Sequence, residues 1–285
     1  MKLAGAPISW GVSEVPAWGH QLPPKRVLAD ARAFGMSAVE AGPPGFLPSD
    51  PKRARRLLAS HDLSLAGGFV TAVLHVRDRQ AEQIGEVEKA ARWLAEAGGE
   101  MLVLAAATGR DGYEAVERID DPAWRTLLDS LVKIREMAVL RGVKLAVHPH
   151  VGTVIEDADT VERLLKETSL PLCLDTGHIF VGGADPADIA ESVPGRIAHV
   201  HLKDADDDLA TLVRERKLPY AEAVRRGLFR PLGEGDASIG DVLAALAASR
   251  YDGWAVLEQD VMLRSEADDP RPAIEKSLAF AKARA

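Results

Sequence analysis

The chain has 285 residues, a length that allows one large domain or two small ones. Its 35 lysines and arginines stand against 43 aspartates and glutamates, and the formal net charge of −8 disfavours a general nucleic-acid binder. Hydrophobic residues make up 47% of the chain, which provides for a sizeable core and excludes wholesale disorder. The single cysteine, Cys173, excludes an internal disulfide and a multi-cysteine zinc site.

The sequence also bears on the compartment in which the protein works. No apolar run approaches the roughly 20 residues that a membrane-spanning helix needs. Residues 1–7 carry one charge and no long apolar stretch, so they do not read as a secretory signal. We therefore expect a cytoplasmic protein without membrane or nucleic-acid partners, and the sequence is compatible with a homo-oligomer.

Short apolar runs alternate with amphipathic segments along the chain. The runs are bounded by glycine, proline or polar residues and predict buried strands at residues 3–10, 38–41, 63–70, 101–106, 143–148, 170–175, 197–202 and 254–258. Helical periodicity predicts helices at residues 24–34, 51–60, 81–97, 121–142, 158–167, 239–248 and 270–283.

This alternation determines the predicted fold class. Eight nearly all-apolar strands alternating with helices indicate a parallel sheet covered by helices. A closed (β/α)₈ barrel has about 250 residues, so we predict one barrel domain over residues 1–285. A doubly wound open sheet is the alternative.

One interval between predicted strands is longer than its neighbours. From His201 to Glu258 there are 57 residues, whereas the two preceding intervals, from His148 and from Asp175, have 27 and 26. The excess falls at about residues 205–236, after the seventh strand, on the face where barrel enzymes carry their sites. We predict a lid or substrate loop there; a surface excursion without a catalytic part is the alternative.

The last four predicted strands each end in a potential metal ligand. These residues are His148, Asp175, His201 and Glu258. Because the carboxyl ends of parallel barrel strands meet at one mouth, we expect the four side chains to converge. Two imidazoles and two carboxylates suit Mn²⁺, Co²⁺ or Zn²⁺, and the set is less suited to Ca²⁺.

Further histidines lie close to these four residues in the sequence. His150 follows His148 by two residues, and His178 follows Asp175 by three. His199, two residues before His201, is predicted to be a core residue one layer below it. Five of the eight histidines thus fall within 54 residues, which strengthens the prediction of a site at this end of the barrel.

Several motifs resemble a known family. They are APISWG at 6–11, EAGPPGFLP at 40–48, HPHVGT at 148–153, LDTGH at 174–178, HVHLKDA at 199–205, GLFRPLGEGD at 227–236 and WAVLEQD at 254–260. Together they resemble the xylose isomerase-like TIM barrel superfamily of sugar isomerases, epimerases and endonuclease IV. Within it the chain is most similar to the inosose dehydratases, of which HPHVGT and the 227–236 motif are the more specific signals.

The resemblance implies a metal-dependent lyase that removes water from a cyclic polyol ketone (2-keto-myo-inositol) in myo-inositol catabolism. It assigns Asp175, His201 and Glu258 as ligands of a divalent ion, with Mn²⁺ or Co²⁺ favoured over Zn²⁺ or Mg²⁺. Most relatives have a glutamate at the fourth ligand position, where this chain has His148; the inosose dehydratases are similar to this chain there. Residues 74–112 show little resemblance, so the exact substrate and its stereochemistry stay open.

Roles for other residues follow from the implied reaction. Glu40, at the end of the second strand, is the candidate base across the mouth, or else a salt-bridged carboxylate. His150 and His178 would orient the substrate or supply the acid, or be structural. Lys203 would hold a substrate oxygen or pair with Asp204. Substrate-binding residues are predicted to be Thr153, Glu234 and Trp10, the last on the first strand as a wall for the sugar or as plain core.

Three other functions are compatible with parts of the sequence. A sugar isomerase or ketose 3-epimerase would use the same metal, but it needs two carboxylate acid/base groups, and His148 replaces one of them. An apurinic endonuclease would need a basic groove and further ligands near strands two to four, where His75 is the only histidine near the strand ends. A non-catalytic sugar-binding barrel would retain the metal without turnover.

Overall fold

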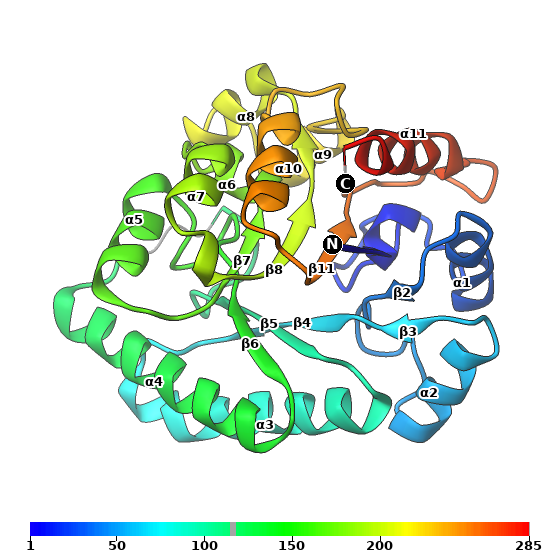
Figure 1. Ribbon diagram of the computed structural model, residues 1–285. Coiled ribbons are helices and arrows are strands. Elements are labelled where there is room, and N and C mark those ends of the chain that lie inside the picture. Colours follow the sequence, from blue (N-terminus) through cyan, green and yellow to red (C-terminus); the bar gives the residue numbers. More distant parts are fainter. Residues whose placement is uncertain (115–117, 285) are drawn as a thin grey trace.

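The computed structural model describes residues 1–114 and 118–284 and shows a parallel sheet that curves round on itself (Figure 1). The strand order is β3-β2-β1-β11-β8-β7-β6-β5-β4. The two strands at the ends of this order, β3 (Ser64–Leu65) and β4 (Gly67–Ala72), are separated only by Ala66. β3 pairs with β2 and β4 pairs with β5, so one chain segment joins both ends of the sheet. The predicted (β/α)₈ barrel is confirmed, and the open doubly wound sheet is excluded.

The remaining barrel strands fall within the predicted apolar runs, except that β1 begins one residue earlier, at Lys2. They are β1 (Lys2–Gly5), β2 (Ala38–Val39), β5 (Met101–Ala106), β6 (Lys144–Val147), β7 (Leu172–Asp175), β8 (Ile197–Leu202) and β11 (Trp254–Leu257). Neighbouring strands pair in parallel, and β1 pairs with β2 on one side and β11 on the other. Every residue of β5 is buried, as expected for strands covered on both faces.

The first predicted strand is shorter than expected. After Gly5 the chain enters a 3₁₀ turn, Pro7–Trp10, because proline lacks the N–H that would continue the ladder and its fixed φ suits the start of a helical turn. The prediction that Trp10 lies on strand one is therefore wrong. Its side chain is fully buried in the main hydrophobic core.

The predicted helices form with ends shifted by at most two residues. They are α1 (Pro24–Ala33), α2 (Pro51–Ala59), α3 (Gln80–Ala97), α4 (Asp121–Leu140), α5 (Ala158–Glu167), α10 (Ile239–Ala248) and α11 (Arg271–Lys282). Two short helices between β7 and β8, α6 (Thr176–Val181) and α7 (Pro186–Ser192), are additional. Aspartate side chains cap the first turns of α2, α4 and α5, and Gly98 ends α3 in the left-handed conformation.

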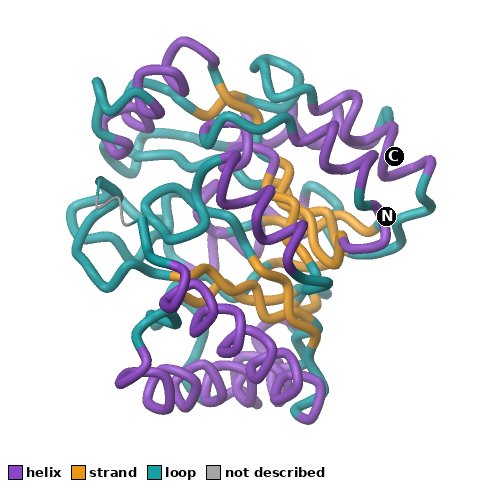
Figure 2. The backbone as a smooth tube through the Cα atoms, turned by 90° about the vertical axis from the view of Figure 1, so that its left-hand side faces the viewer, coloured by secondary structure: helices purple, strands orange, loops and turns teal. Residues whose placement is uncertain are grey.

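The helices surround the strands, and loops gather at one side of the barrel (Figure 2). The apolar helix faces and the strand residues that face them form the main core. The alternate strand residues, among them Met101, Val103, Ala146 and Cys173, form smaller separate clusters. Among the described residues, no helix is long and apolar enough to cross a membrane.

The long interval after β8 folds into a distinct layer, which we call the cover segment (residues 204–236). It contains β9 (Asp204–Ala205), α8 (Asp207–Arg214), α9 (Tyr220–Arg225) and β10 (Phe229–Arg230). β9 and β10 pair antiparallel and bring the two ends of the segment together. The two helices of the segment, α8 and α9, are separated by a stretch that contains Arg216 in the left-handed conformation with φ of 58°.

The cover segment has its own apolar cluster. The cluster joins cover residues to side chains from the barrel loops: Trp18, Val151, Val181, Ala205, Ala210, Val213, Leu218, Tyr220, Ala223, Val224, Leu228 and Phe229. The Asp204 carboxylate fixes the base of the segment, because it accepts backbone N–H groups from Gly233, Gly235 and Ala237. A Cβ at Gly235 would come within 2.5 Å of Asp204 Oδ1, so this close approach requires glycine.

Candidate metal centre

The four predicted ligands converge at the carboxyl ends of neighbouring strands, and we call them the metal quartet (His148, Asp175, His201 and Glu258). The Asp175 Oδ2 atom lies 3.3 Å from His201 Nδ1 and 3.5 Å from His148 Nε2. His201 Nδ1 lies 3.2 Å from Glu258 Oε2. Metal bonds of about 2.0–2.2 Å, meeting at about 90–110°, place donor atoms roughly 3.0–3.5 Å apart. Asp175, His201 and Glu258 therefore have the spacing of donors around one divalent ion, and His148 lies beside Asp175.

The hydrogen bonds inside the quartet point to the same conclusion. Asp175 Oδ2 and His201 Nδ1 are buried atoms without a hydrogen-bond partner among the described residues. Such atoms are costly in a protein interior unless a ligand or water satisfies them. His148 Nδ1 lies 2.6 Å from the Pro149 carbonyl, so Nδ1 carries the proton and Nε2 keeps a lone pair. The residues present fit a divalent metal.

The quartet is charged in the interior of the barrel. Burial alone would raise the pKa of Asp175, but the Lys203 ammonium and His178 outweigh it and hold that pKa well below its usual range. Burial raises the pKa of Glu258, opposed by His201 and Lys203. The pKa of His201 is raised by the surrounding acidic groups, although burial opposes this. Asp175 is thus held as a carboxylate, the form in which it can bind a cation.

Glu40 was predicted to lie across the mouth from the metal ligands. It lies instead beside His201, at the ring nitrogen that faces away from Asp175. Its Oε1 atom is 2.9 Å from His199 Nε2 and 3.2 Å from His201 Nε2. The Glu40 residue is only 4% exposed. Burial would raise its pKa, but His201 and His199 lower it. With its oxygen bonded to two imidazoles, Glu40 is placed to hold them.

Lys203 is fully buried and pairs with three acidic side chains. Its Nζ lies 2.6 Å from Glu258 Oε1, 2.9 Å from Asp260 Oδ1 and 3.6 Å from Asp175 Oδ2. The predicted pairing with Asp204 is wrong, since neighbouring residues of an extended chain point to opposite faces. Asp204 instead binds the backbone of the cover segment.

His150 and His178 lie together beside His148 of the quartet. Their ring centroids are 3.7 Å apart, and His178 Nε2 is 3.2 Å from Lys203 Nζ. The His150 Nδ1 atom is 2.8 Å from the Val151 carbonyl, so it carries the proton and leaves Nε2 as an acceptor. Burial, helped by His148 and Lys203, lowers the pKa of His150 to about 3. A neutral imidazole with a free lone pair can accept a proton.

Three residues predicted to bind substrate have other partners. The Thr153 hydroxyl lies 2.7 Å from the His150 carbonyl and 3.1 Å from that of Ile155, so it closes a turn. Glu234 is exposed and pairs with Lys276 at 2.8 Å, which places it on the outer surface. Trp10 is core. None of these side chains is brought into the quartet.

Sequence reasoning missed a second group of residues around the site. The Tyr220 hydroxyl donates to Asp260 Oδ2 at 2.7 Å, and Asp260 also holds Lys203. Tyr113 packs on Tyr220 at 4.6 Å between centroids and stacks over His150 at 5.9 Å. Asp260 closes the WAVLEQD motif and could have been found there, whereas no local pattern marks the two tyrosines.

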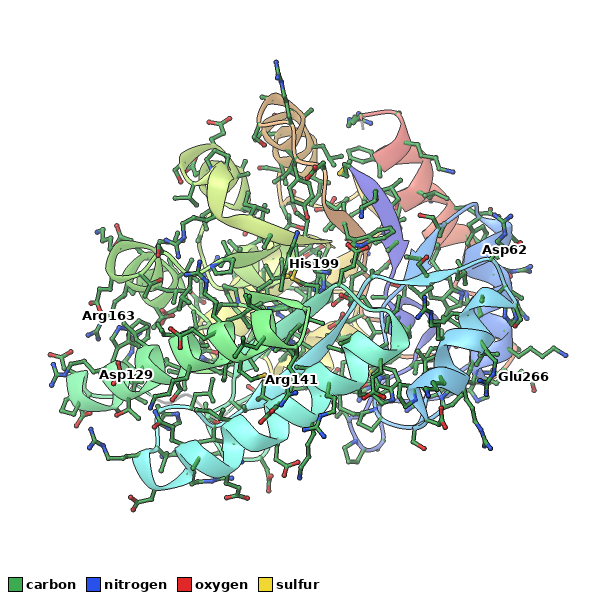
Figure 3. The ribbon with its side chains drawn as sticks, turned by 60° about the horizontal axis from the view of Figure 1, so that its bottom comes forward. Asp62, Asp129, Arg141, Arg163, His199 and Glu266 are labelled. Carbon is green, nitrogen blue, oxygen red and sulfur yellow. The ribbon has the colours of Figure 1, made fainter. Side chains whose placement is uncertain are left out.

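These tyrosines pack on His150 and His178, and the histidines and aspartate of the quartet are at most 1% exposed. Figure 3 shows His199, in the same strand as His201, near the centre of the molecule, whereas labelled residues such as Asp62 and Arg163 lie at its edge. A cleft of about 880 Å³ lies to one side, between residues 156–159, residues 180–185 and α8, and its lining includes none of the quartet.

Comparisons with known proteins agree with this geometry. The family model described as xylose isomerase-like TIM barrel matches residues 28–284. An inosose dehydratase from Geobacillus kaustophilus is 30% identical over 270 residues, which cover 91% of this chain and 87% of the relative. The solved structure of a probable 3-DHS dehydratase, AsbF, from Bacillus anthracis superposes with a TM-score of 0.75 at 17% identity over the full length of both chains.

A second solved structure carries a metal. The IOLI protein with a bound zinc atom superposes with a TM-score of 0.72 at 16% identity, covering 99% of this chain and 97% of that one. At this identity the likeness concerns the fold, while the match to the family model covers most of the chain. The protein is an enzyme and belongs to the xylose isomerase-like TIM barrel family.

Proposed function

We propose that this enzyme is a metal-dependent hydro-lyase that eliminates water from a cyclic polyol ketone, an inosose such as 2-keto-myo-inositol, in the cytoplasmic catabolism of inositol. The observation that carries the proposal is the metal quartet, with two buried donor atoms that have no hydrogen-bond partner in the described part of the chain. The 30% identity to an inosose dehydratase over 91% of the chain supports the substrate class.

The quartet would hold the ion through His148 Nε2, Asp175 Oδ2, His201 Nδ1 and Glu258 Oε2. Two nitrogen and two carboxylate donors suit Mn²⁺ or Co²⁺, with Zn²⁺ or Mg²⁺ as alternatives. The zinc atom in the IOLI structure supports a divalent ion in this family's barrels. When bound, the ion supplies Lewis-acid stabilisation of negative charge that develops on a substrate oxygen.

The residues above the quartet would carry the proton transfers. His150 Nε2 is the proposed base that removes the proton α to the ketone, because its Nδ1 proton is engaged by the Val151 carbonyl. As the carbon–oxygen bond breaks, the departing hydroxide takes a proton from the Lys203–His178 pair and leaves as water. This assignment replaces Glu40 as base, since Glu40 lies on the far side of His201.

The cover segment is the proposed lid. Tyr220 and Phe229 from this segment pack on His178, and Tyr113 from the loop after β5 packs on Tyr220 and His150. These rings surround the position of the substrate above the quartet. A closed aromatic lid excludes water while the proton is being moved, which strengthens the electrostatic interactions inside.

A second candidate is an isomerase or ketose 3-epimerase with the same metal. These reactions need two carboxylates for proton transfer, and His148 stands at one of those positions. The test is to incubate the metal-loaded enzyme with 2-keto-myo-inositol and follow ultraviolet absorbance and product mass. A conjugated product that has lost one water supports the dehydratase. A change in optical rotation without loss of water would establish the alternative.

A further inference from the structure

We propose that Glu40 and His199 act as positioning residues, which fix His201 in the one tautomer that presents its Nδ1 lone pair to the metal quartet. The inference rests on the proposed function only in requiring that the quartet binds a divalent ion.

The argument begins with the two faces of the His201 ring. On one side, Nδ1 lies 3.3 Å from Asp175 Oδ2 and 3.2 Å from Glu258 Oε2. On the other side, Nε2 lies 3.2 Å from Glu40 Oε1. A neutral imidazole has one N–H and one lone pair, so the ring can serve both sides only if Nε2 donates to Glu40. Nδ1 is then the nitrogen left to bind the ion.

Glu40 must be a carboxylate for this arrangement to work, and His199 provides for that. His199 and His201 lie two residues apart in β8, so their side chains point to the same face of the strand. Their ring centroids are 5.3 Å apart, and both Nε2 atoms approach the same oxygen, Glu40 Oε1. Two N–H donors compensate a buried negative charge better than one does. His199 thus holds Glu40 in the charged form and position that His201 needs.

The chain topology makes this support precise. Glu40 directly follows β2, while both histidines come from β8. The two contacts therefore cross the barrel interior and join residues that are 159 and 161 positions apart in the sequence. All three residues are at most 4% exposed. Orientation of a ligating histidine by a carboxylate is a general way to raise its basicity, and loss of such a partner lowers metal affinity about 10–100-fold.

One competing interpretation must be separated from this one. Glu40, His199 and His201 present donor atoms within 4.8 Å of one another, which is also compatible with a second ion. That ion would require His201 to bridge two metals through both nitrogens and give up its proton. Titration of the purified protein with Mn²⁺ or Co²⁺ decides between the two. One ion per chain supports the positioning role, and two ions per chain overturn it.

The main experiment compares metal affinity by calorimetry in the wild type and in Glu40→Gln, which keeps the size of the side chain and removes its charge. We expect affinity for Mn²⁺ or Co²⁺ to fall about 10–100-fold, with an altered visible absorption spectrum of the Co²⁺ form. Glu156→Gln is the matched control, because Glu156 is a buried glutamate that binds Arg216 and the Gly152 N–H, outside the quartet. Unchanged affinity in Glu40→Gln, or an equal loss in Glu156→Gln, overturns the inference.

His199→Phe tests the second part of the proposal. It should weaken the metal less than Glu40→Gln does, and combining the two changes should add little, because His199 acts through Glu40. Fully additive losses would contradict this dependence.

A measurement on the wild type does not depend on whether the variants fold. ¹⁵N NMR of the histidine rings in the Zn²⁺-loaded protein should show His201 protonated at Nε2 and coordinated at Nδ1. Coordination through Nε2 overturns the inference. If the wild type binds one ion in this way and yet dehydrates no inosose, the proposed function is wrong and the positioning role of Glu40 and His199 still holds.

Discussion

Lys203 Nζ lies 2.6 Å from Glu258 Oε1, and both groups lie deep in the barrel mouth. The same ammonium contacts Asp260, which accepts a hydrogen bond from the Tyr220 hydroxyl of the cover segment. The three carboxylates of Asp175, Glu258 and Asp260 thus face one built-in cation. A divalent ion would bring the charge of this group to zero, so Lys203 and the metal together balance the site.

The first prediction concerns Lys203→Met. Without the ammonium, three buried carboxylates lose their partner, and the metal-free protein should lose about 3–5 kcal/mol of unfolding free energy. Dehydration should be lost as well. Urea unfolding in the presence of a chelator measures the stability. Lys276→Met, which removes an exposed partner of Glu234, should cost at most about 1 kcal/mol. Equal stability of Lys203→Met and the wild type would contradict the charge balance.

The second prediction concerns the metal quartet itself. Asp175→Asn, His201→Ala and Glu258→Gln should each abolish turnover with little loss of fold, because each removes a donor that fixes the ion. Metal content by elemental analysis and circular dichroism check the two halves of this expectation. Removal of the metal with a chelator should abolish the dehydration activity of the wild type, and addition of Mn²⁺ or Co²⁺ should restore it. A variant that keeps full activity and full metal content removes its residue from the quartet.

The third prediction concerns His148→Glu. With neutral imidazoles, the quartet and a divalent ion carry no net charge, whereas a glutamate at 148 would leave one negative charge. The ion should bind more tightly and act as a weaker Lewis acid, because more ligand charge offsets its own. Dehydration should therefore fall, and any new activity should be proton transfer without loss of water. Metal affinity measured beside the dehydration rate tests this, and an unchanged rate would show that His148 does not tune the metal.

The fourth prediction concerns the lid. Asp206 N donates to the Leu228 carbonyl at 2.9 Å, so the ends of the cover segment lie together. Replacing about residues 205–226 by a short glycine linker should leave a folded barrel whose turnover rate is strongly reduced. Wild-type turnover in the deletion protein would show that the segment is no lid, and failure to fold would place it in the core or in a subunit interface.

A milder change tests the lid without altering its backbone. Tyr220→Phe removes the hydroxyl that bonds to Asp260 and keeps the ring on His178. A hydrogen bond to a charged group is worth about 1.5–3 kcal/mol, so kcat should fall at least roughly 10-fold while metal affinity stays constant. An unchanged kcat would mean that this bond does not contribute to closure over the substrate.

The sequence alone indicated the barrel and the convergence of the four residues that we propose as metal ligands. Periodicity and glycine or proline boundaries are local properties, so they located the eight strand positions and most helices to within a few residues. The quartet followed because the carboxyl ends of parallel strands meet at one mouth whatever the details of packing. His199 was also placed correctly in the core, since alternation along a strand is local.

The tertiary structure alone decided which groups face each other across the barrel. Glu40 meets His199 and His201 through strand register around a closed sheet, which no local pattern encodes. The same holds for the contact between Lys203 and Asp260, and for Tyr220 over His178, because the fold of the cover segment sets its own aromatic cluster. Side-chain partners at a distance depend on the three-dimensional path of the chain, and the roles of the acids and bases depend on those partners.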